Sequence, residues 1–330
     1  MLNKLNKIAV TATMVCGSLL TTAAHADAVY TVTSDTGVVA PLVTAESSGK
    51  GSAETGGIVS FRGADVGRRD AEAEFSARTY STREIAEFAA KYKTMIPAYA
   101  RDQVQTESVI GADRRFRKYT TTFPERAIGQ LTFSQAGSNY ICTAWLIGKD
   151  TIATAGHCVH QGNGGVFSTN GKFYPGRNGA SDPYGSCTVR QWRTNSTWIS
   201  NGSDEYDYGT AKLNCTIGNT TGWFGWFWTT ASLVGLPVEV SGYPGDTAAG
   251  THYASVSDIT VSETRKTRYP QDTAGGQSGS PVFERDRAAG ACTGACANSI
   301  HAYGANGGNN SGTRITQTVS NFFTSSVSAP

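Results

Sequence analysis

Three short motifs hold a histidine, an aspartate and a serine that together could hydrolyse an amide bond. His157 lies in TAGHC, Asp207 in DYG and Ser278 in DTAGGQSGSPVF, in that order along the chain. A serine hydroxyl attacks an amide only when an imidazole takes its proton, and a buried carboxylate then fixes the tautomer of the imidazole and stabilises its charged form. The three motifs therefore predict a catalytic triad with Ser278 as the nucleophile.

The glycines before Ser278 could meet a second requirement, the stabilisation of an oxyanion. Gly276 stands two residues before Ser278, so the backbone amides of both could converge on one oxygen. Each motif also has an ordinary explanation, since a histidine beside a cysteine is more often structural and a lone aspartate before a strand is usually a turn or cap residue. Their joint occurrence favours the triad. An α/β-hydrolase is excluded because its nucleophile elbow needs glycine where Ser280 stands.

The elements that would position these residues are short strands after residue 108. Apolar and polar residues alternate with the period of a strand in the stretches 139–148, 206–213, 238–244 and 252–263. The apolar run TIA places His157 where the chain leaves such a strand. Many short strands predict an all-β domain built of barrels or a sandwich, and the aromatic run GWFGWFW at 222–228 suits its core and a strand edge.

Two helices are expected outside this strand pattern. The first, over 81–92, begins with the capping box S-x-x-E and continues with apolar residues at helical spacing. The second follows from the same spacing of apolar residues in 315–322, near the C-terminus. The apolar face of the first helix needs a partner, which could be the domain after residue 108, if the segment is a propeptide, or a small helical domain of its own.

The first 26 residues have the pattern of a secretory signal. Lys4 and Lys7 precede a short apolar stretch at 8–20, which is followed by the small-x-small sequence Ala-His-Ala ending at Ala26. A membrane anchor needs about 20 mostly apolar residues, and neither this stretch nor any later one provides them. We therefore expect an exported protein with no membrane partner.

Residues 27–107 differ in composition from residues 108–330. The first segment has no cysteine and carries 9 basic and 12 acidic residues, a net charge of −3, whereas the second carries 17 basic and 14 acidic residues, a net charge of +3. The opposite signs permit contact between the two segments. Neither segment has the dense basic patch of a nucleic-acid binder, so nucleic acid is not an expected partner.

Six cysteines remain once the signal and its Cys16 are removed. They are Cys142, Cys158, Cys187, Cys215, Cys292 and Cys296. An even number in an exported chain indicates disulfides, and the short spacing of CTGAC favours a bond between Cys292 and Cys296. Zinc is the competing explanation, but the cluster His157-Cys158-Val159-His160 has no second pair at zinc-finger spacing. We expect neither a metal site nor a cofactor.

The three motifs also carry a resemblance to a known family. TAGHC, DYG and DTAGGQSGSPVF resemble the secreted bacterial glutamyl endopeptidases, a branch of the chymotrypsin-like serine proteases, in which the triad has the same order. The stretches ESVIGADRR (107–115), YPGRNGASDPYGS (174–186), SGYPGD (241–246) and GTRIT (312–316) extend the similarity over most of residues 108–330. It implies two six-stranded Greek-key barrels with the triad between them, acting as a secreted monomer on protein or peptide substrates.

The resemblance further implies a proenzyme. Cleavage would create a new N-terminus at Ser108, directly after Glu107, and would divide the chain into a signal (1–26), a partly helical propeptide (27–107) that binds the enzyme, and a protease domain (108–330). A glutamate-specific enzyme could make this cut itself. The alternative is that Glu107 is one linker acid among many, with the linker cut by another protease or left intact.

The same resemblance assigns the specificity pocket. Thr273, His301 and the freed amino group of Ser108 would receive the side chain of a substrate glutamate or aspartate, because a buried carboxylate needs hydrogen-bond donors or positive charge. Asp272 keeps an alternative open, since trypsin-like enzymes hold the carboxylate that recognises lysine or arginine at this distance before the serine. A protease fold used as a binding module or toxin, with little turnover, is the alternative from another class.

Enzymes of this class often join cysteines equivalent to Cys142 and Cys158, which would pin the loop of His157. That pairing leaves Cys187 and Cys215 for each other. The family resemblance does not itself supply this last pair, and a disulfide needs a short distance that sequence alone does not give.

Overall fold

The computed structural model describes residues 31–37, 39–41, 52–54, 58–65, 78–79, 96–97, 108–288, 290–306 and 308–330. The expected signal at 1–26, the helix expected over 81–92 and Glu107 lie outside these residues. Within the described ranges, no helix is both long and apolar enough to cross a bilayer.

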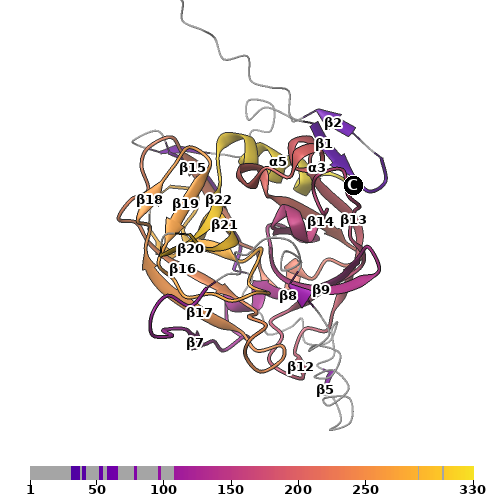
Figure 1. Cartoon of the computed structure of the whole chain (residues 1–330), viewed down its shortest axis with the longest axis horizontal. Coiled ribbons are helices and arrows are strands. Elements are labelled where there is room, and N and C mark those ends of the chain that lie inside the picture. The colour runs from indigo at the N-terminus through magenta and orange to yellow at the C-terminus, as the bar shows by residue number, and fades with distance from the viewer. Residues whose placement is uncertain are drawn as a thin grey trace, which may run out of the picture.

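Six antiparallel strands form a closed barrel in the first half of the 108–330 segment (Figure 1). Pairing runs from β8 through β9, β10, β14, β13 and β11 back to β8. The strands are β8 (Ile128–Gln135), β9 (Ser138–Leu146), β10 (Thr151–Thr154), β11 (Thr169–Pro175), β13 (Cys187–Asn195) and β14 (Gly209–Leu213). Leu131, Ile152 and Phe173 fill its core.

A second sheet follows in the order β18, β19, β22, β21, β20, β16, β17 and β7. Its strands are β7 (Phe116–Arg117), β16 (Pro237–Gly242), β17 (Tyr253–Asp258), β18 (Val261–Ser262), β19 (Lys266–Tyr269), β20 (Pro281–Arg287), β21 (Gly294–Asn306) and β22 (Asn309–Arg314). The stretch 252–263, predicted as one strand, divides into β17 and β18. Strand pairing among the described residues leaves this sheet open, unlike the first.

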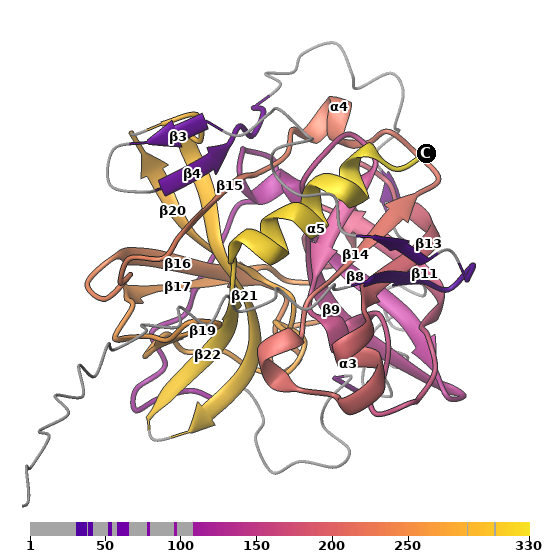
Figure 2. The same ribbon diagram turned by 90° about the horizontal axis from the view of Figure 1, so that it is seen from above.

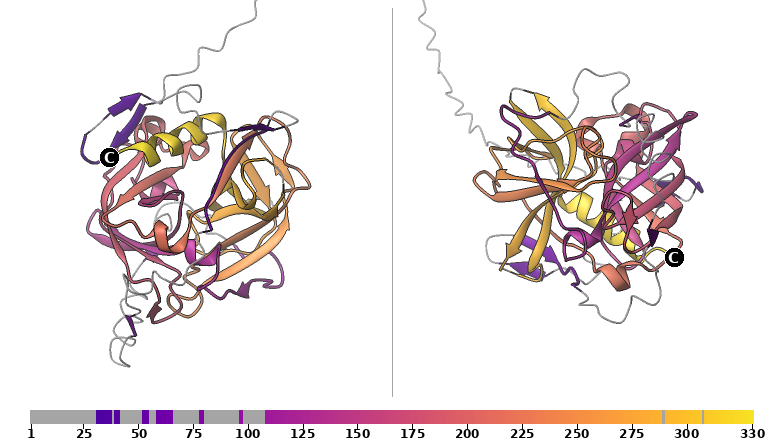
Figure 3. Two further views of the ribbon diagram at one scale, coloured as in Figure 1. Left: turned by 180° about the vertical axis from the view of Figure 1, so that it is seen from behind. Right: turned by 90° about the horizontal axis from the view of Figure 1, so that it is seen from below.

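One side chain spans the opening of the second sheet. The Nε2 amide of Gln271, just after β19, donates to the carbonyl of Val238 in β16 at 3.0 Å and to that of Ser257 in β17 at 3.2 Å. The ends of the sheet are therefore held together by side-chain hydrogen bonds where backbone pairing stops. Figure 3 shows the two groups of strands side by side.

The predicted C-terminal helix is confirmed as α5 (Gln317–Ser328), which packs between the two groups of strands (Figure 2). Thr316 caps its N-terminus, accepting a hydrogen bond from the amide of Val319 at 3.3 Å. Phe323 lies against Trp145 of β9 and Trp226 of β15 (Gly225–Thr229). The remaining short elements are α3 (Ser196–Asn201), α4 (Gly218–Thr221), η2 (Glu125–Ala127), η3 (Gly156–Cys158), η4 (Asp204–Tyr206) and β12 (Ser181–Asp182).

Described residues before 108 add strands to both groups (Figure 2). The first group gains β1 (Thr31–Ser34), β2 (Val39–Pro41) and β6 (Ile96–Pro97), and the second gains β3 (Ser52–Glu54) and β4 (Ile58–Phe61). A further strand, β5 (Arg78–Thr79), pairs with β12 in a separate two-stranded sheet. β1 pairs with β13, β4 with β15 and β6 with β9. The ring of Phe61 stacks on Trp226 with centroids 5.0 Å apart, so this segment contacts the domain through apolar surface as well as backbone.

Candidate active site

His157 lies in the 3-10 turn η3, immediately after β10 ends, as the apolar run before it predicts. Its Nδ1 is 2.7 Å from Oδ2 of Asp207, and its backbone amide donates to Oδ1 of the same carboxylate at 2.7 Å. Gly156 allows this approach, because a Cβ there would lie 2.9 Å from Oδ1 of Asp207. The TAGHC motif therefore needs its glycine to bring imidazole and carboxylate together.

Asp207 follows η4 and precedes β14, and its side chain is 0% exposed. Its backbone carbonyl accepts a hydrogen bond from Thr313 of β22 at 3.0 Å, so strands of both groups fix its position. Burial by itself would raise the pKa of Asp207. The charge of His157 and its hydrogen bonds to the carboxylate outweigh burial and hold that pKa below its ordinary value. The carboxylate is thus ionised at neutral pH and able to orient the imidazole.

Ser278 lies in the turn between β19 and β20, against the strands that lead to His157. Its carbonyl accepts a hydrogen bond from the amide of Thr143 in β9 at 2.8 Å. Next to it, Gly279 has a φ of +87°, and a Cβ there would lie 2.1 Å from Oγ1 of Thr154, at the end of β10. These contacts bring the serine to the loop of His157 at the junction of the two sheets.

Gly276 has a backbone conformation that suits glycine alone. Its φ is +103°, and a Cβ would lie 2.6 Å from the carbonyl oxygen of Tyr243. Among the described residues, its amide has no hydrogen-bond partner. The carbonyl of Gly276 accepts from the hydroxyl of Thr143 at 2.9 Å, and the same hydroxyl accepts from the amide of Tyr243 at 2.9 Å. Thr143 therefore anchors the loop, a role that sequence reasoning missed.

Thr273 and His301 are both buried near this loop. The hydroxyl of Thr273 has no hydrogen-bond partner within the described part of the chain. Nδ1 of His301 is 2.8 Å from the hydroxyl of Tyr269. Burial, aided by the charge of His157, lowers the pKa of His301 to about 3, so its imidazole is neutral. If Tyr269 donates to Nδ1, the proton of the neutral ring resides on Nε2, which becomes a donor.

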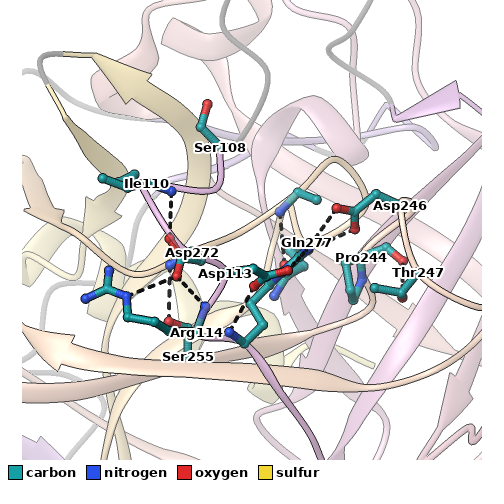
Figure 4. A network of polar contacts seen from close by, with 12 residues as sticks. Ser108, Ile110, Asp113, Arg114, Pro244, Asp246, Thr247, Ser255, Asp272 and Gln277 are labelled. Carbon is teal, nitrogen blue, oxygen red and sulfur yellow. Dashed lines mark hydrogen bonds and ion pairs between the residues drawn. The ribbon is translucent and has the colours of Figure 1, made fainter.

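Asp272 is fully buried and turned toward the segment that begins at Ser108 (Figure 4). Its Oδ1 accepts from the amide of Ile110 at 2.7 Å, and its Oδ2 accepts from the amide and the Nε of Arg114 at 2.9 and 3.2 Å. Both carboxylate oxygens are thus occupied by the chain itself. The alternative in which Asp272 recognises a substrate lysine or arginine loses its physical basis.

The structure contains the disulfides Cys142–Cys158, Cys187–Cys215 and Cys292–Cys296, with Cα atoms 6.3, 6.0 and 5.9 Å apart. The first joins β9 to the turn of His157. Cys142, His157 and Cys158 form the one cluster of potential metal ligands found among the described residues. Because both of its sulfurs are in a disulfide, neither is a thiolate that could bind a metal.

The fold and the pairing of His157 with Asp207 define the class of a trypsin-like serine peptidase, and a family model of the trypsin-like peptidase domain matches residues 142–291. The chain is 45% identical over 248 residues to the glutamyl endopeptidase of Bacillus licheniformis, an alignment that covers 74% of this chain and 76% of that protein. This chain therefore belongs to the glutamyl endopeptidase family, as its motifs predict.

One further relative and one solved structure match a similar share of the chain. The chain is 42% identical over 224 residues to a Bacillus subtilis protein named extracellular metalloprotease, covering 66% of this chain and 69% of the relative. A solved structure of a Glu endopeptidase in complex with MPD superimposes with a TM-score of 0.60 at 29% identity, covering 67% of this chain and all of that one. The chymotrypsin-like fold is thus supported by structure as well as by sequence.

Proposed function

We propose that this protein is a secreted serine endopeptidase that cleaves peptide bonds after glutamate. The observation that carries the specificity is the unpartnered, buried hydroxyl of Thr273, which lies in a loop that also contacts Ser108. A buried hydroxyl without a partner is unfavourable by about 1 to 3 kcal/mol, and a substrate carboxylate would supply the missing hydrogen bond.

The geometry supports the following reaction. Nε2 of His157 takes the proton of the Ser278 hydroxyl as its oxygen attacks the carbonyl carbon, while Asp207 stabilises the imidazolium. The amides of Gly276 and Ser278 donate to the oxyanion. The imidazolium then protonates the leaving amine as the peptide C–N bond breaks, giving an acyl-enzyme. Water, deprotonated by His157, hydrolyses this ester and restores the serine.

The proposed pocket offers three different donors to the substrate carboxylate. Thr273 contributes its hydroxyl, His301 the Nε2–H of a neutral imidazole, and Ser108 an ammonium group that exists only after cleavage. The amide of Thr273 donates to the carbonyl of Ser108 at 3.2 Å, so the pocket residue and the new N-terminus are directly joined. A buried carboxylate is stable only with such hydrogen bonds and charge.

Maturation follows from the same proposal. A signal ending at Ala26 is removed on export, residues 27–107 are the propeptide, and cleavage between Glu107 and Ser108 releases the protease domain, 108–330, which acts as an extracellular monomer. The strands that residues 31–97 add to both sheets support binding between propeptide and enzyme. We further propose that the second sheet is the second six-stranded barrel of the fold, with the hydrogen bonds of Gln271 at its seam.

The test is a panel of peptides that differ only in the residue before the scissile bond, with glutamate, aspartate, glutamine and arginine compared. We expect kcat/KM for glutamate to exceed that for glutamine by roughly a hundredfold, the value of two charge-assisted hydrogen bonds. Cleavage after arginine but not after glutamate would reject the proposed specificity. A Ser278→Ala variant should lose nearly all hydrolysis, and normal turnover by that variant would reject the serine mechanism.

A further inference from the structure

The segment that starts at Ser108 is held by a second buried side chain besides Asp272. Asn310, in β22, accepts a hydrogen bond from the amide nitrogen of Ser108 on its Oδ1 at 3.2 Å. Its Nδ2 donates to the carbonyl of Ser108 at 2.7 Å and to the carbonyl of Gln271 at 2.7 Å. One amide side chain therefore binds both backbone polar groups of the residue that the proposed cleavage would make N-terminal.

Asp272 holds the same segment further along. Its carboxylate collects the amides of Ile110 and Arg114, while its own backbone amide donates to the hydroxyl of Ser255 in β17 at 3.1 Å (Figure 4). Asp272 is also the residue directly before Thr273. Asn310 reaches the residue before that, Gln271. Both residues that hold the N-terminal segment are thus connected to the backbone next to Thr273, Asp272 through the chain and Asn310 through its hydrogen bond to Gln271.

We propose that Asn310 and Asp272 are positioning residues for acidic specificity, acting together as a clamp that sets the amino group of Ser108 against the pocket. The inference rests on the proposed cleavage and glutamate preference. After cleavage the Ser108 nitrogen carries three N–H bonds in place of one. Oδ1 of Asn310 accepts one of them, and the ammonium group adds a positive charge that attracts a substrate carboxylate.

The identity of each clamp residue matters. Aspartate at position 310 would accept from the ammonium group but could not donate to the carbonyls of Ser108 and Gln271, and its charge would repel a substrate carboxylate. Asparagine at position 272 would turn one NH2 group toward donors from Ile110 or Arg114, leaving them unsatisfied. Both substitutions hardly change side-chain size, but Asn310→Asp adds a negative charge to the clamp and Asp272→Asn removes one.

An ion pair on the same segment provides a matched control. Arg115, one residue beyond the clamp, donates to both oxygens of Asp246, at 2.8 and 2.7 Å. The side chain of Asp246 is 46% exposed, and its ion pair is with Arg115. Asp246→Asn therefore weakens an anchor of the segment without touching the residues that position Ser108.

The experiment compares Asn310→Asp, Asp272→Asn and the control Asp246→Asn with the parent protein. To make maturation independent of activity, a recognition sequence for an unrelated protease replaces the residues before Ser108, and mass spectrometry verifies the new N-terminus. Values of kcat and KM are measured for two peptides that differ only in glutamate or glutamine before the cut. Arg114→Ala, whose side chain is 54% exposed, is included as a clamp variant with little demand on folding.

For both buried clamp variants we expect kcat/KM on the glutamate peptide to fall about tenfold or more, mainly through KM, which corresponds to one charge-assisted hydrogen bond. The glutamine peptide should change by less than about threefold, and Arg114→Ala should show the same selectivity with a smaller loss. Asp246→Asn should match the parent. Equal losses on both peptides, or none on either, would overturn the proposal.

A second readout does not use peptide hydrolysis. The rate at which an acetylating reagent modifies the amino group of Ser108 should rise in the two buried variants and stay unchanged in Asp246→Asn, because the clamp shields that group. If the parent shows no glutamate preference, the proposed function fails, and the labelling rates still decide whether the clamp holds Ser108. Equal labelling in parent and clamp variants would refute the clamp.

Discussion

The protease domain has two buried carboxylates near Ser278: Asp207, which faces His157, and Asp272, six residues before the serine. Each side chain is 0% exposed. Asp207 faces an imidazole, whereas Asp272 faces two backbone amides and a guanidinium. The partner of Asp207 gains and loses a proton in the proposed reaction. The partners of Asp272 keep their hydrogens at every step. Burial and charge alone therefore do not reveal what a carboxylate does; the chemistry of its donors does.

The largest contrast is expected when each carboxylate becomes an amide. Asp207→Asn should lower kcat by about 10⁴-fold, because an amide NH2 toward Nδ1 would favour the wrong tautomer of His157. Asp272→Asn should change kcat by less than about tenfold and act on KM for acidic substrates. Steady-state kinetics on one glutamate peptide, with circular dichroism as a check of folding, measures both. Similar losses of kcat in the two variants would contradict the assignment of different roles to Asp207 and Asp272.

The histidines of the two regions should also differ in their response to pH. His157 must accept a proton in the reaction, whereas burial lowers the pKa of His301 to about 3. Burial likewise lowers the pKa of His252, which stands directly before β17, to about 3. Between pH 6.5 and 3 the unfolded chain binds these two protons and the folded chain does not. The free energy of unfolding should therefore fall as the pH falls through this window, by at most about 2.7 kcal/mol per unit.

Denaturant titrations between pH 6.5 and 4.5 measure this slope. The lowered pKa of Asp207 contributes little there, because its stabilising effect is lost only as the pH falls below the ordinary value of 3.8. His252→Phe removes one of the two groups while keeping a ring to stack on Tyr243. It should roughly halve the slope relative to the parent. An unchanged slope would show that His252 is protonated in the folded state.

The smallest effects are expected from a matched pair of tyrosines. Tyr303→Phe removes a hydroxyl that helps to lower the pKa of Asp207, while keeping a ring beside His157, and should reduce kcat severalfold. Tyr269→Phe removes the partner of Nδ1 of His301 and should raise KM for glutamate peptides severalfold with kcat nearly unchanged. The two phenylalanine variants, assayed side by side, separate the catalytic region from the pocket. If both altered the same constant, the two regions would not be functionally separate.

Much of the site can be predicted from sequence because its motifs are local. TAGHC and DYG identify the pair His157 and Asp207, which the structure joins at 2.7 Å. The strand period likewise predicts β9, β14 and β16, and the helical spacing of apolar residues predicts the C-terminal helix α5. The division of 252–263 into two strands was missed, since alternation continues across the break between them.

The residues that sequence reasoning missed are those whose partners are distant in the chain. Thr143 binds Gly276, 133 positions away, and Asn310 binds Ser108, 202 positions away. Such contacts depend on the register of strands in different sheets, which no local pattern encodes. A polar residue inside a buried strand, as Thr143 is in β9, was the one available signal. For Asp272 the sequence supplies the position but not the direction in which the carboxylate points.

The strands contributed by residues before 108 make cleavage after Glu107 and dissociation of that segment two separate events. Hydrogen bonds of β1 with β13 and of β4 with β15, and the stacking of Phe61 on Trp226, do not depend on the Glu107–Ser108 bond. Cutting that bond would therefore leave a two-chain complex. The dissociation of this complex would be a concentration-dependent equilibrium. Release of the protease domain would therefore require dilution outside the cell as well as hydrolysis of the peptide bond.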